Sequence, residues 1–144
     1  MINLLLADDD IDDCLFFQEA LEELSIENNL TTVDDGVKLM NYLLKEGTIL
    51  PDILFLDLNM PRKSGYECLL ELKKIDSLKE IPVVIFSTSQ NTDIVEDLYT
   101  NGAHYYIRKP GDFSILKKVI GDALLLLEQN NKQRPELINF IILS

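Results

Sequence analysis

The 144-residue sequence predicts an α/β fold in which helices cover both faces of a parallel sheet. Short apolar runs, typical of buried strands, alternate with longer amphipathic segments along almost the whole chain. Each strand-like run is followed by a helix-like segment, and this alternation favours a parallel sheet. Hydrophobic residues make up 47% of the chain and charged residues 26%, as in globular proteins rather than disordered ones.

Five short runs rich in Leu, Ile, Val and Phe predict the strands. Turn-forming or polar residues bound them, as Pro51 and Asp57 do around the third run. The predicted strands are Ile2–Leu6, Leu30–Val33, Ile53–Leu56, Val83–Phe86 and Tyr105–Ile107.

Apolar residues spaced three and four apart predict a helix after each strand. In the first helix Phe17, Leu21 and Leu24 share one face, and Asp10 or Asp12 is expected to cap the N-terminus. The other predicted helices run from Val37 to near Gly47, from Gly65 to Ile75, around Ile94–Leu98, and from Phe113 to about Asn130.

Residues 1–131 are predicted to form one domain, and residues 132–144 a C-terminal tail outside the alternating pattern. The tail is apolar after Glu136. Its apolar residues are Leu137, Ile138, Phe140, Ile141, Ile142 and Leu143. Ile and Phe favour a strand, whereas Pro135 favours the first turn of a short helix. Such a segment either folds back on its own domain or contributes to a homodimer contact.

The charge and the cysteine content limit the classes of partner. With 25 acidic and 13 basic residues the formal net charge is -12, which disfavours binding to a nucleic-acid backbone. Cys14 and Cys68 are too few for a disulfide framework. No apolar run approaches the roughly 20 residues that span a bilayer, and Asp8 comes too early for a signal peptide. We expect a cytoplasmic protein without a nucleic-acid or membrane partner.

Polar side chains collect at the carboxyl ends of the predicted strands. Asp8 and Asp9 follow the first strand, Asp57 the third, Ser87 the fourth and Lys109 the fifth. Ligands of open α/β sheets bind beyond these ends. The five side chains therefore predict a functional site. His104, the only histidine, is expected to be packed or exposed rather than catalytic.

The chemistry of this set points to phosphoryl transfer. Crowded carboxylates raise one another's pKa, and a divalent cation removes that cost. An all-oxygen site with room for phosphate suits Mg²⁺. An aspartate can act as a nucleophile, while a lysine and a hydroxyl bind the phosphoryl oxygens. The alternative is that the carboxylates only cap helices, but Ser87 and Lys109 at the neighbouring strand ends argue against it.

Four stretches together resemble the receiver domain of two-component response regulators. They are LLADDD at 5–10, DILFLDLNMPRKSG at 52–65, IPVVIFSTS at 81–89 and YYIRKP at 105–110. The resemblance covers residues 2 to about 128. It implies a doubly wound, flavodoxin-like sheet of five parallel strands in the order 2-1-3-4-5.

The resemblance also implies roles for the acidic side of the site. Asp57 matches the phosphoacceptor, which is also a metal ligand, and Asp9 the direct Mg²⁺ ligand. Asp8 matches the second acid of the metal site, often acting through water, and Asn59 the residue whose backbone carbonyl binds the metal. Gly65 fits the turn that leads into the third helix.

Further matches concern the last two strands. Ser87 and Tyr106 match the hydroxyl and the aromatic ring of the family's switch, and Lys109 matches the lysine that pairs with the phosphoryl group. The resemblance implies a cis peptide bond between Lys109 and Pro110. Thr88 stands where the family usually has Ala or Gly, which puts the lifetime of the phosphoryl group in doubt.

The implied function is that of a single-domain response regulator in a phosphorelay. A sensor histidine kinase or phosphotransfer protein would phosphorylate Asp57, and a downstream protein would read the result. The chain would catalyse its own Mg²⁺-dependent phosphotransfer and slow dephosphorylation without being a dedicated enzyme. Two alternatives are an aspartyl phosphatase and a docking module. An aspartyl phosphatase usually has a second acid at the position that Asn59 occupies here. A docking module would not need all of the expected site residues, and all of them are present.

Overall fold

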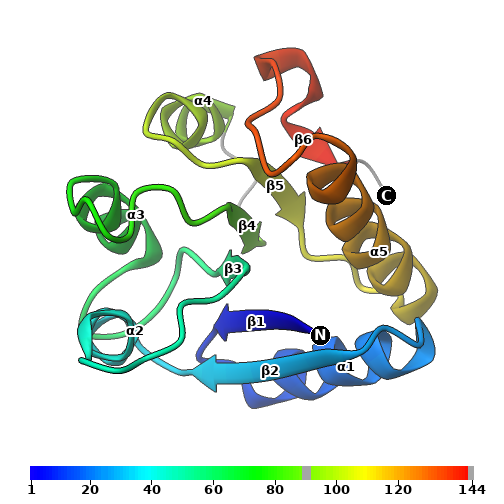
Figure 1. Ribbon diagram of the computed structural model, residues 1–144. Coiled ribbons are helices and arrows are strands. Elements are labelled where there is room, and N and C mark those ends of the chain that lie inside the picture. Colours follow the sequence, from blue (N-terminus) through cyan, green and yellow to red (C-terminus); the bar gives the residue numbers. More distant parts are fainter. Residues whose placement is uncertain (89–91, 143–144) are drawn as a thin grey trace.

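A computed structural model describes residues 1–88 and 92–142, and its centre is a parallel sheet (Figure 1). Within the described residues the sheet has six strands in the order β2-β1-β3-β4-β5-β6. The first five confirm the predicted order 2-1-3-4-5. The strands are β1 (Ile2–Ala7), β2 (Asn28–Val33), β3 (Ile53–Leu56), β4 (Val83–Ser87), β5 (Tyr105–Arg108) and β6 (Ile141–Ile142).

Helices cover both faces of the sheet, with α1 and α5 on one face and α2, α3 and α4 on the other (Figure 1). They are α1 (Ile11–Glu23), α2 (Gly36–Leu44), α3 (Gly65–Lys73), α4 (Thr92–Thr100) and α5 (Phe113–Gln129). Asp10 is the N-cap of α1, as predicted: its carboxylate accepts a hydrogen bond of 3.1 Å from the backbone N–H of Asp13. Asp35, Ser64 and Asp112 cap α2, α3 and α5 in the same way.

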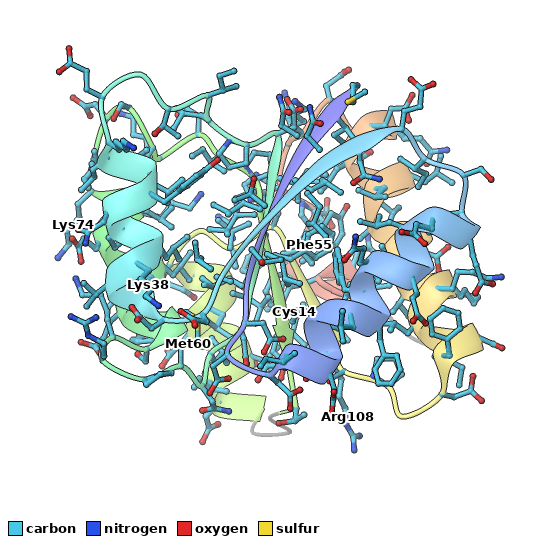
Figure 2. The ribbon with its side chains drawn as sticks, turned by 90° about the horizontal axis from the view of Figure 1, so that it is seen from below. Cys14, Lys38, Phe55, Met60, Lys74 and Arg108 are labelled. Carbon is cyan, nitrogen blue, oxygen red and sulfur yellow. The ribbon has the colours of Figure 1, made fainter. Side chains whose placement is uncertain are left out.

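Strand residues alternate between two apolar clusters, because successive side chains of a strand point to opposite faces. Phe55 faces α1, and its ring centroid lies 4.8 Å from that of Phe17. Leu54 and Leu56 face α2 and α3. Figure 2 shows Phe55 in the interior and Arg108 pointing away from the domain. Both faces are buried, which explains why the strands read as continuous apolar runs.

The two cysteines are free and belong to these packed layers. Cys68 is buried in α3 and Cys14 is partly buried in α1. Within the described part of the chain, no helix is long and apolar enough to cross a membrane.

The C-terminal tail adds a sixth strand to the sheet, for which five strands were predicted. After α5 the chain forms a 3₁₀ turn at Leu137–Asn139, and β6 then pairs in parallel with β5. The tail therefore folds back on its own domain, which was one of the two alternatives. Both local predictions were right, because a helical turn follows Pro135 and the Ile residues form a strand. A strand of two residues is too short to produce an alternating pattern. The sequence therefore does not show that this segment joins the sheet, and only its pairing with β5 in the structure does. Leu143 lies outside the described residues.

His104 precedes β5 and is buried there. Its Nδ1 accepts a hydrogen bond of 3.2 Å from the backbone N–H of Val83. Burial lowers the pKa of His104 to about 4, and the nearby positive charges of Lys73 and Arg134 contribute. The imidazole is therefore a neutral packing residue rather than a proton donor at neutral pH.

This burial predicts a loss of stability in acid. Between pH 6.5 and pH 4 the unfolded chain binds a proton at His104 and the folded chain does not. The free energy of unfolding should therefore fall by about 3 kcal/mol over this range, at about 1.36 kcal/mol per pKa unit. Urea unfolding of the wild type and His104→Gln at several pH values measures it. The variant should lack this part of the slope, and parallel curves would contradict the assignment.

Candidate functional site

The carboxylates of Asp8, Asp9 and Asp57 come together at the carboxyl end of the sheet. Ala7 of β1 is in register with Leu56 of β3, so the residues that follow these strands are neighbours. One carboxylate oxygen from each aspartate lies within 4.8 Å of those of the other two. Asp8 and Asp57 are buried and Asp9 is exposed, so the cluster opens to solvent on one side.

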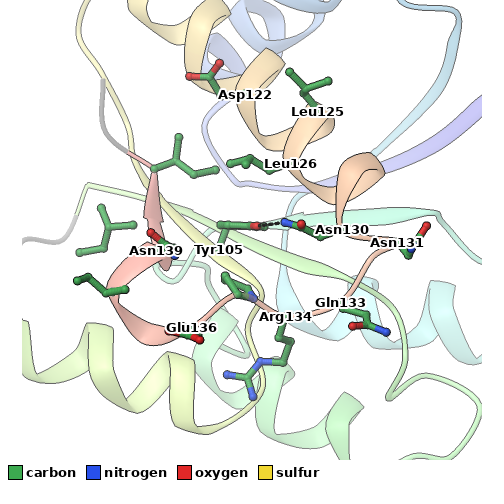
Figure 3. A pocket seen from close by; sticks show the side chains of 14 residues that line it. Tyr105, Asp122, Leu125, Leu126, Asn130, Asn131, Gln133, Arg134, Glu136 and Asn139 are labelled. Carbon is green, nitrogen blue, oxygen red and sulfur yellow. Dashed lines mark hydrogen bonds between the residues drawn. The ribbon is translucent and has the colours of Figure 1, made fainter.

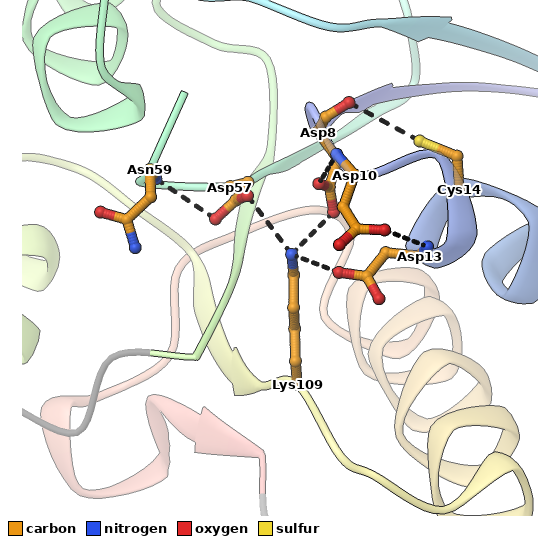
Figure 4. Close-up of polar contacts among 7 residues, drawn as sticks. All are labelled: Asp8, Asp10, Asp13, Cys14, Asp57, Asn59 and Lys109. Carbon is orange, nitrogen blue, oxygen red and sulfur yellow. Dashed lines mark hydrogen bonds and ion pairs between the residues drawn. The ribbon is translucent and has the colours of Figure 1, made fainter. Parts of the chain in front are cut away.

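Lys109 extends from the end of β5 into this cluster (Figure 4). Its Nζ lies 2.8 Å from Asp8 Oδ2, 2.8 Å from Asp13 Oδ2 and 3.3 Å from Asp57 Oδ2. The backbone N–H of Lys109 donates a hydrogen bond of 2.8 Å to the carbonyl oxygen of Ser87, which fixes the residue against β4. One ammonium group thus faces three carboxylates.

Asp13 was missed by the sequence analysis. It lies in the first turn of α1, three residues after the N-cap Asp10, whose carboxylate accepts a hydrogen bond from the Asp13 backbone N–H. That spacing was the available signal, but Asp13 stands in a run where almost every residue is acidic.

Burial and charge act in opposite directions on these groups. Burial raises the pKa of Asp8 to about 6, although Lys109 and the backbone N–H of Asp10 partly oppose it. Burial also raises the pKa of Asp57, against the influence of Lys109. For Lys109 burial lowers the pKa, but its close contacts with the carboxylates of Asp13 and Asp8 and the charge of Asp57 outweigh burial and raise it. Lys109 therefore stays charged, yet it cannot neutralise three carboxylates.

The loop after Asp57 depends on a glycine. A Cβ atom at Gly65 would lie 2.0 Å from the carbonyl oxygen of Asp57, so no other residue allows this approach without a shift of the backbone. The N–H of Gly65 also donates a hydrogen bond of 2.9 Å to the carbonyl of Leu58. Asn59, between them, is exposed, and its backbone N–H donates to Asp57 Oδ1 at 3.3 Å. These contacts set the position of the Asp57 carboxylate.

The other predicted site residues lie on β4 and β5. Ser87 is the last residue of β4 and is buried. Tyr106 is buried on the face of the sheet that α4 covers, and Thr88 is exposed. The peptide bond between Lys109 and Pro110 is trans, so the cis bond implied by the resemblance was wrong. An X–Pro bond adopts either form at small cost, and local sequence does not decide between them.

The match to known proteins fits this arrangement of strand-end residues. Residues 4–121 match the response regulator receiver domain. The chain belongs to this family. The receiver domain is 35% identical to "Response regulator Rcp1" of Synechocystis over 81% of this chain and 82% of Rcp1. It is 32% identical to "Probable methanogenesis regulatory protein FilR2" of Methanothrix harundinacea over 81% of this chain and 77% of FilR2.

Solved structures of receiver proteins share the fold. The phosphorylated cyanobacterial phytochrome response regulator RcpA superposes with a TM-score of 0.81 at 34% identity, over 94% of this chain and 99% of RcpA. The Mn²⁺-bound form of Rcp1 gives a TM-score of 0.80 at 31% identity, with the same coverage of both chains. The similarity therefore extends beyond the site to almost the whole length of these proteins.

The residues of the cluster fit the divalent metal that receiver domains bind. The donor set is three carboxylates, which suits a hard cation. Asp8 Oδ2 is buried beside Lys109 Nζ but accepts no well-directed hydrogen bond, so it has a lone pair to offer. Asp9, on the open side, gives the ion a route from solvent.

A divalent cation should stabilise the folded chain, because the cluster exists only in the native state. At ten times its Kd a ligand adds about 1.4 kcal/mol to the free energy of unfolding. The melting temperature should rise in a millimolar titration with Mg²⁺ or Mn²⁺, and Asp9→Ala should abolish the rise. Asp12→Ala is the matched control, since Asp12 is an exposed acid of the same run outside the cluster. A wild-type melting temperature unchanged by either ion would contradict the metal site.

Proposed function

We propose that this receiver domain is a phosphorylation-operated switch, a single-domain response regulator that accepts a phosphoryl group on Asp57. The observation that carries the proposal is the environment of Asp57. Its carboxylate is buried, lies 3.3 Å from the Lys109 ammonium and forms a cluster with the carboxylates of Asp8 and Asp9. A nucleophile, a fixed positive charge and a place for a cation thus occur within one cluster.

Phosphotransfer would begin with attack of an Asp57 carboxylate oxygen on the phosphorus of a phosphohistidine. The new O–P bond forms as the P–N bond breaks, and the imidazole nitrogen leaves with the bonding pair. Lys109 and the hydroxyl of Ser87 would bind the transferred oxygens. Asp8, Asp9, Asp57 and the backbone carbonyl of Asn59 would hold Mg²⁺, whose charge offsets that of the phosphoryl group.

Receiver domains are signalling proteins without a dedicated catalytic activity, and the site supports that role here. An aspartyl phosphatase usually has a second acid two residues after the nucleophile to protonate its leaving group. The residue two positions after Asp57 is Asn59, whose side chain is not acidic and is exposed. Thr88 is exposed next to Ser87, where it would narrow the approach of water and so lengthen the life of the phosphoryl group.

Receiver domains take the phosphoryl group from histidine kinases or phosphotransfer proteins, and we propose such a partner in the cytoplasm. Ser87 and Tyr106 would carry the change from the site to the surface of α4, β5 and α5, where an unidentified downstream protein binds. The formal charge of -12 supports protein contacts rather than nucleic acid. Exposed Ile138 and Ile141 near the edge strand β6 support a homodimer, which light scattering with and without beryllofluoride tests.

Asp57→Asn should abolish phosphorylation while the fold is retained, because the change is nearly isosteric and removes the nucleophilic charge. The variant should also unfold at no lower temperature, since it relieves repulsion in the cluster. Mass spectrometry after incubation with phosphoramidate and Mg²⁺ should show one phosphoryl group per wild-type chain and none on Asp57→Asn. Asp12→Asn should label like the wild type.

The same experiment separates the alternatives. Labelling of Asp57→Asn at the wild-type rate would show that the acceptor is another residue. Continuous turnover of phosphoramidate without a stoichiometric adduct would indicate a phosphatase. Neither labelling nor turnover in the wild type would leave a docking module.

A further inference from the structure

The tail is fastened to the C-terminal end of α4 by specific polar contacts. Arg134 donates hydrogen bonds to the carbonyl oxygens of Ala103, at 3.2 Å, and Tyr99. The Arg134 guanidinium also lies 4.2 Å from the centre of the Tyr99 ring. In return the Tyr99 hydroxyl donates a hydrogen bond of 2.7 Å to the carbonyl of Pro135. The tail is therefore held at a defined place, and these contacts orient the residues that follow.

Phe140 inserts between α4 and β5. Its side chain is fully buried, with ring centroids 5.2 Å from Tyr99 and 6.4 Å from Tyr106. Its carbonyl oxygen accepts a hydrogen bond of 3.0 Å from the backbone N–H of Tyr106. Phe140 thus contacts Tyr106 through both its ring and its backbone.

On the α5 side the tail borders an open pocket. A pocket of about 1090 Å³ lies between the tail and α5 (Figure 3). Tyr105, Leu125, Arg134 and Ile141 are among the residues that line it. Ile142 of the tail is buried in the apolar cluster on the α5 side, and Phe140 is the fully buried tail residue on the α4 side.

The strand that the tail holds is the strand that presents Lys109. Tyr106 and Ile107 of β5 pair with Ile141 and Ile142 of β6. Lys109 follows two residues after Ile107 and points into the carboxylate cluster. Without β6 this part of β5 would be an edge strand paired only with β4. The tail thus restrains the backbone segment on which the position of the Lys109 ammonium depends.

We propose that the tail is an intramolecular brace that strengthens the hold of Asp57 on a phosphoryl group, with Phe140 as a positioning residue. The inference rests on the proposed phosphorylation of Asp57. In the braced chain Lys109 already lies against Asp57 and Asp8. A phosphoryl group that pairs with Lys109 therefore binds the braced state better than the released one, and it shifts the population toward the braced state. By linkage, docking of the tail and phosphorylation favour each other equally.

Beryllofluoride, an analogue of the phosphoryl group, tests the brace at equilibrium. NMR titration in the presence of Mg²⁺ gives its Kd for the wild type and for Phe140→Ala. We expect at least about fivefold weaker binding by the variant, the lower end of typical coupling between sites. Phe140→Leu, which keeps an apolar side chain, should recover part of the affinity. Gln133→Ala is the matched control, because Gln133 is an exposed residue of the same tail outside the contacts described above, and its Kd should equal the wild-type value.

Hydrogen exchange in the wild type gives a second readout that needs no variant to fold. Beryllofluoride should slow exchange of the Tyr106 amide, which is bonded to the Phe140 carbonyl. The Leu24 amide, bonded to Ala20 at the end of α1, reports the general stabilisation that any ligand of the native state produces. The brace predicts a larger slowing at Tyr106 than at Leu24.

The outcomes distinguish the brace from the function on which it rests. If the wild type binds beryllofluoride, equal Kd values for Phe140→Ala and wild type, or equal slowing at the two amides, overturn the brace and leave the proposed function standing. If the wild type neither binds beryllofluoride nor labels with phosphoramidate, the proposed function fails and the brace fails with it.

Discussion

The contact on which the rest of the structure depends is that of the Lys109 ammonium with the surrounding carboxylates. It joins the ends of β1, β3 and β5 and the first turn of α1 through Asp8, Asp57 and Asp13. Buried charges are tolerated only when they are paired, and removal of one partner leaves the others uncompensated. The site is therefore also a structural junction, and its remaining negative charge is what makes it suited to a cation.

The sheet places these groups before any chemistry occurs. In a parallel sheet each strand delivers its C-terminal residue to the same edge, and the order of β1 and β3 makes Asp8 and Asp57 neighbours. Gly65 then allows α3 to begin against the backbone of Asp57, which a side chain would prevent. The acidic residues are thus held close by the packing of apolar strands, which outweighs their mutual repulsion.

Sequence reasoning succeeded where a local pattern has one structural meaning. Apolar runs followed by Asp8, Asp57 or Lys109 predicted both the strands and the edge at which their polar residues meet. It failed where the decisive interaction is between distant segments. The pairing of β6 with β5 joins residues 35 positions apart, Tyr106 with Ile141, and no periodicity in two residues announces it. Asp13 was hidden among other acids, because only the helix start distinguishes the one that faces Lys109.

The tail rests on tyrosines in a chain that has no tryptophan. Three of the five tyrosines contact the tail or the turn before it: Tyr99 through Pro135, Tyr105 through Asn130 and Tyr106 through Phe140. The tyrosine absorption and emission of this protein come from all five phenol rings, these three among them, without interference from indole. Release of the tail would change the surroundings of three of these rings, so tyrosine fluorescence can report whether the tail is docked.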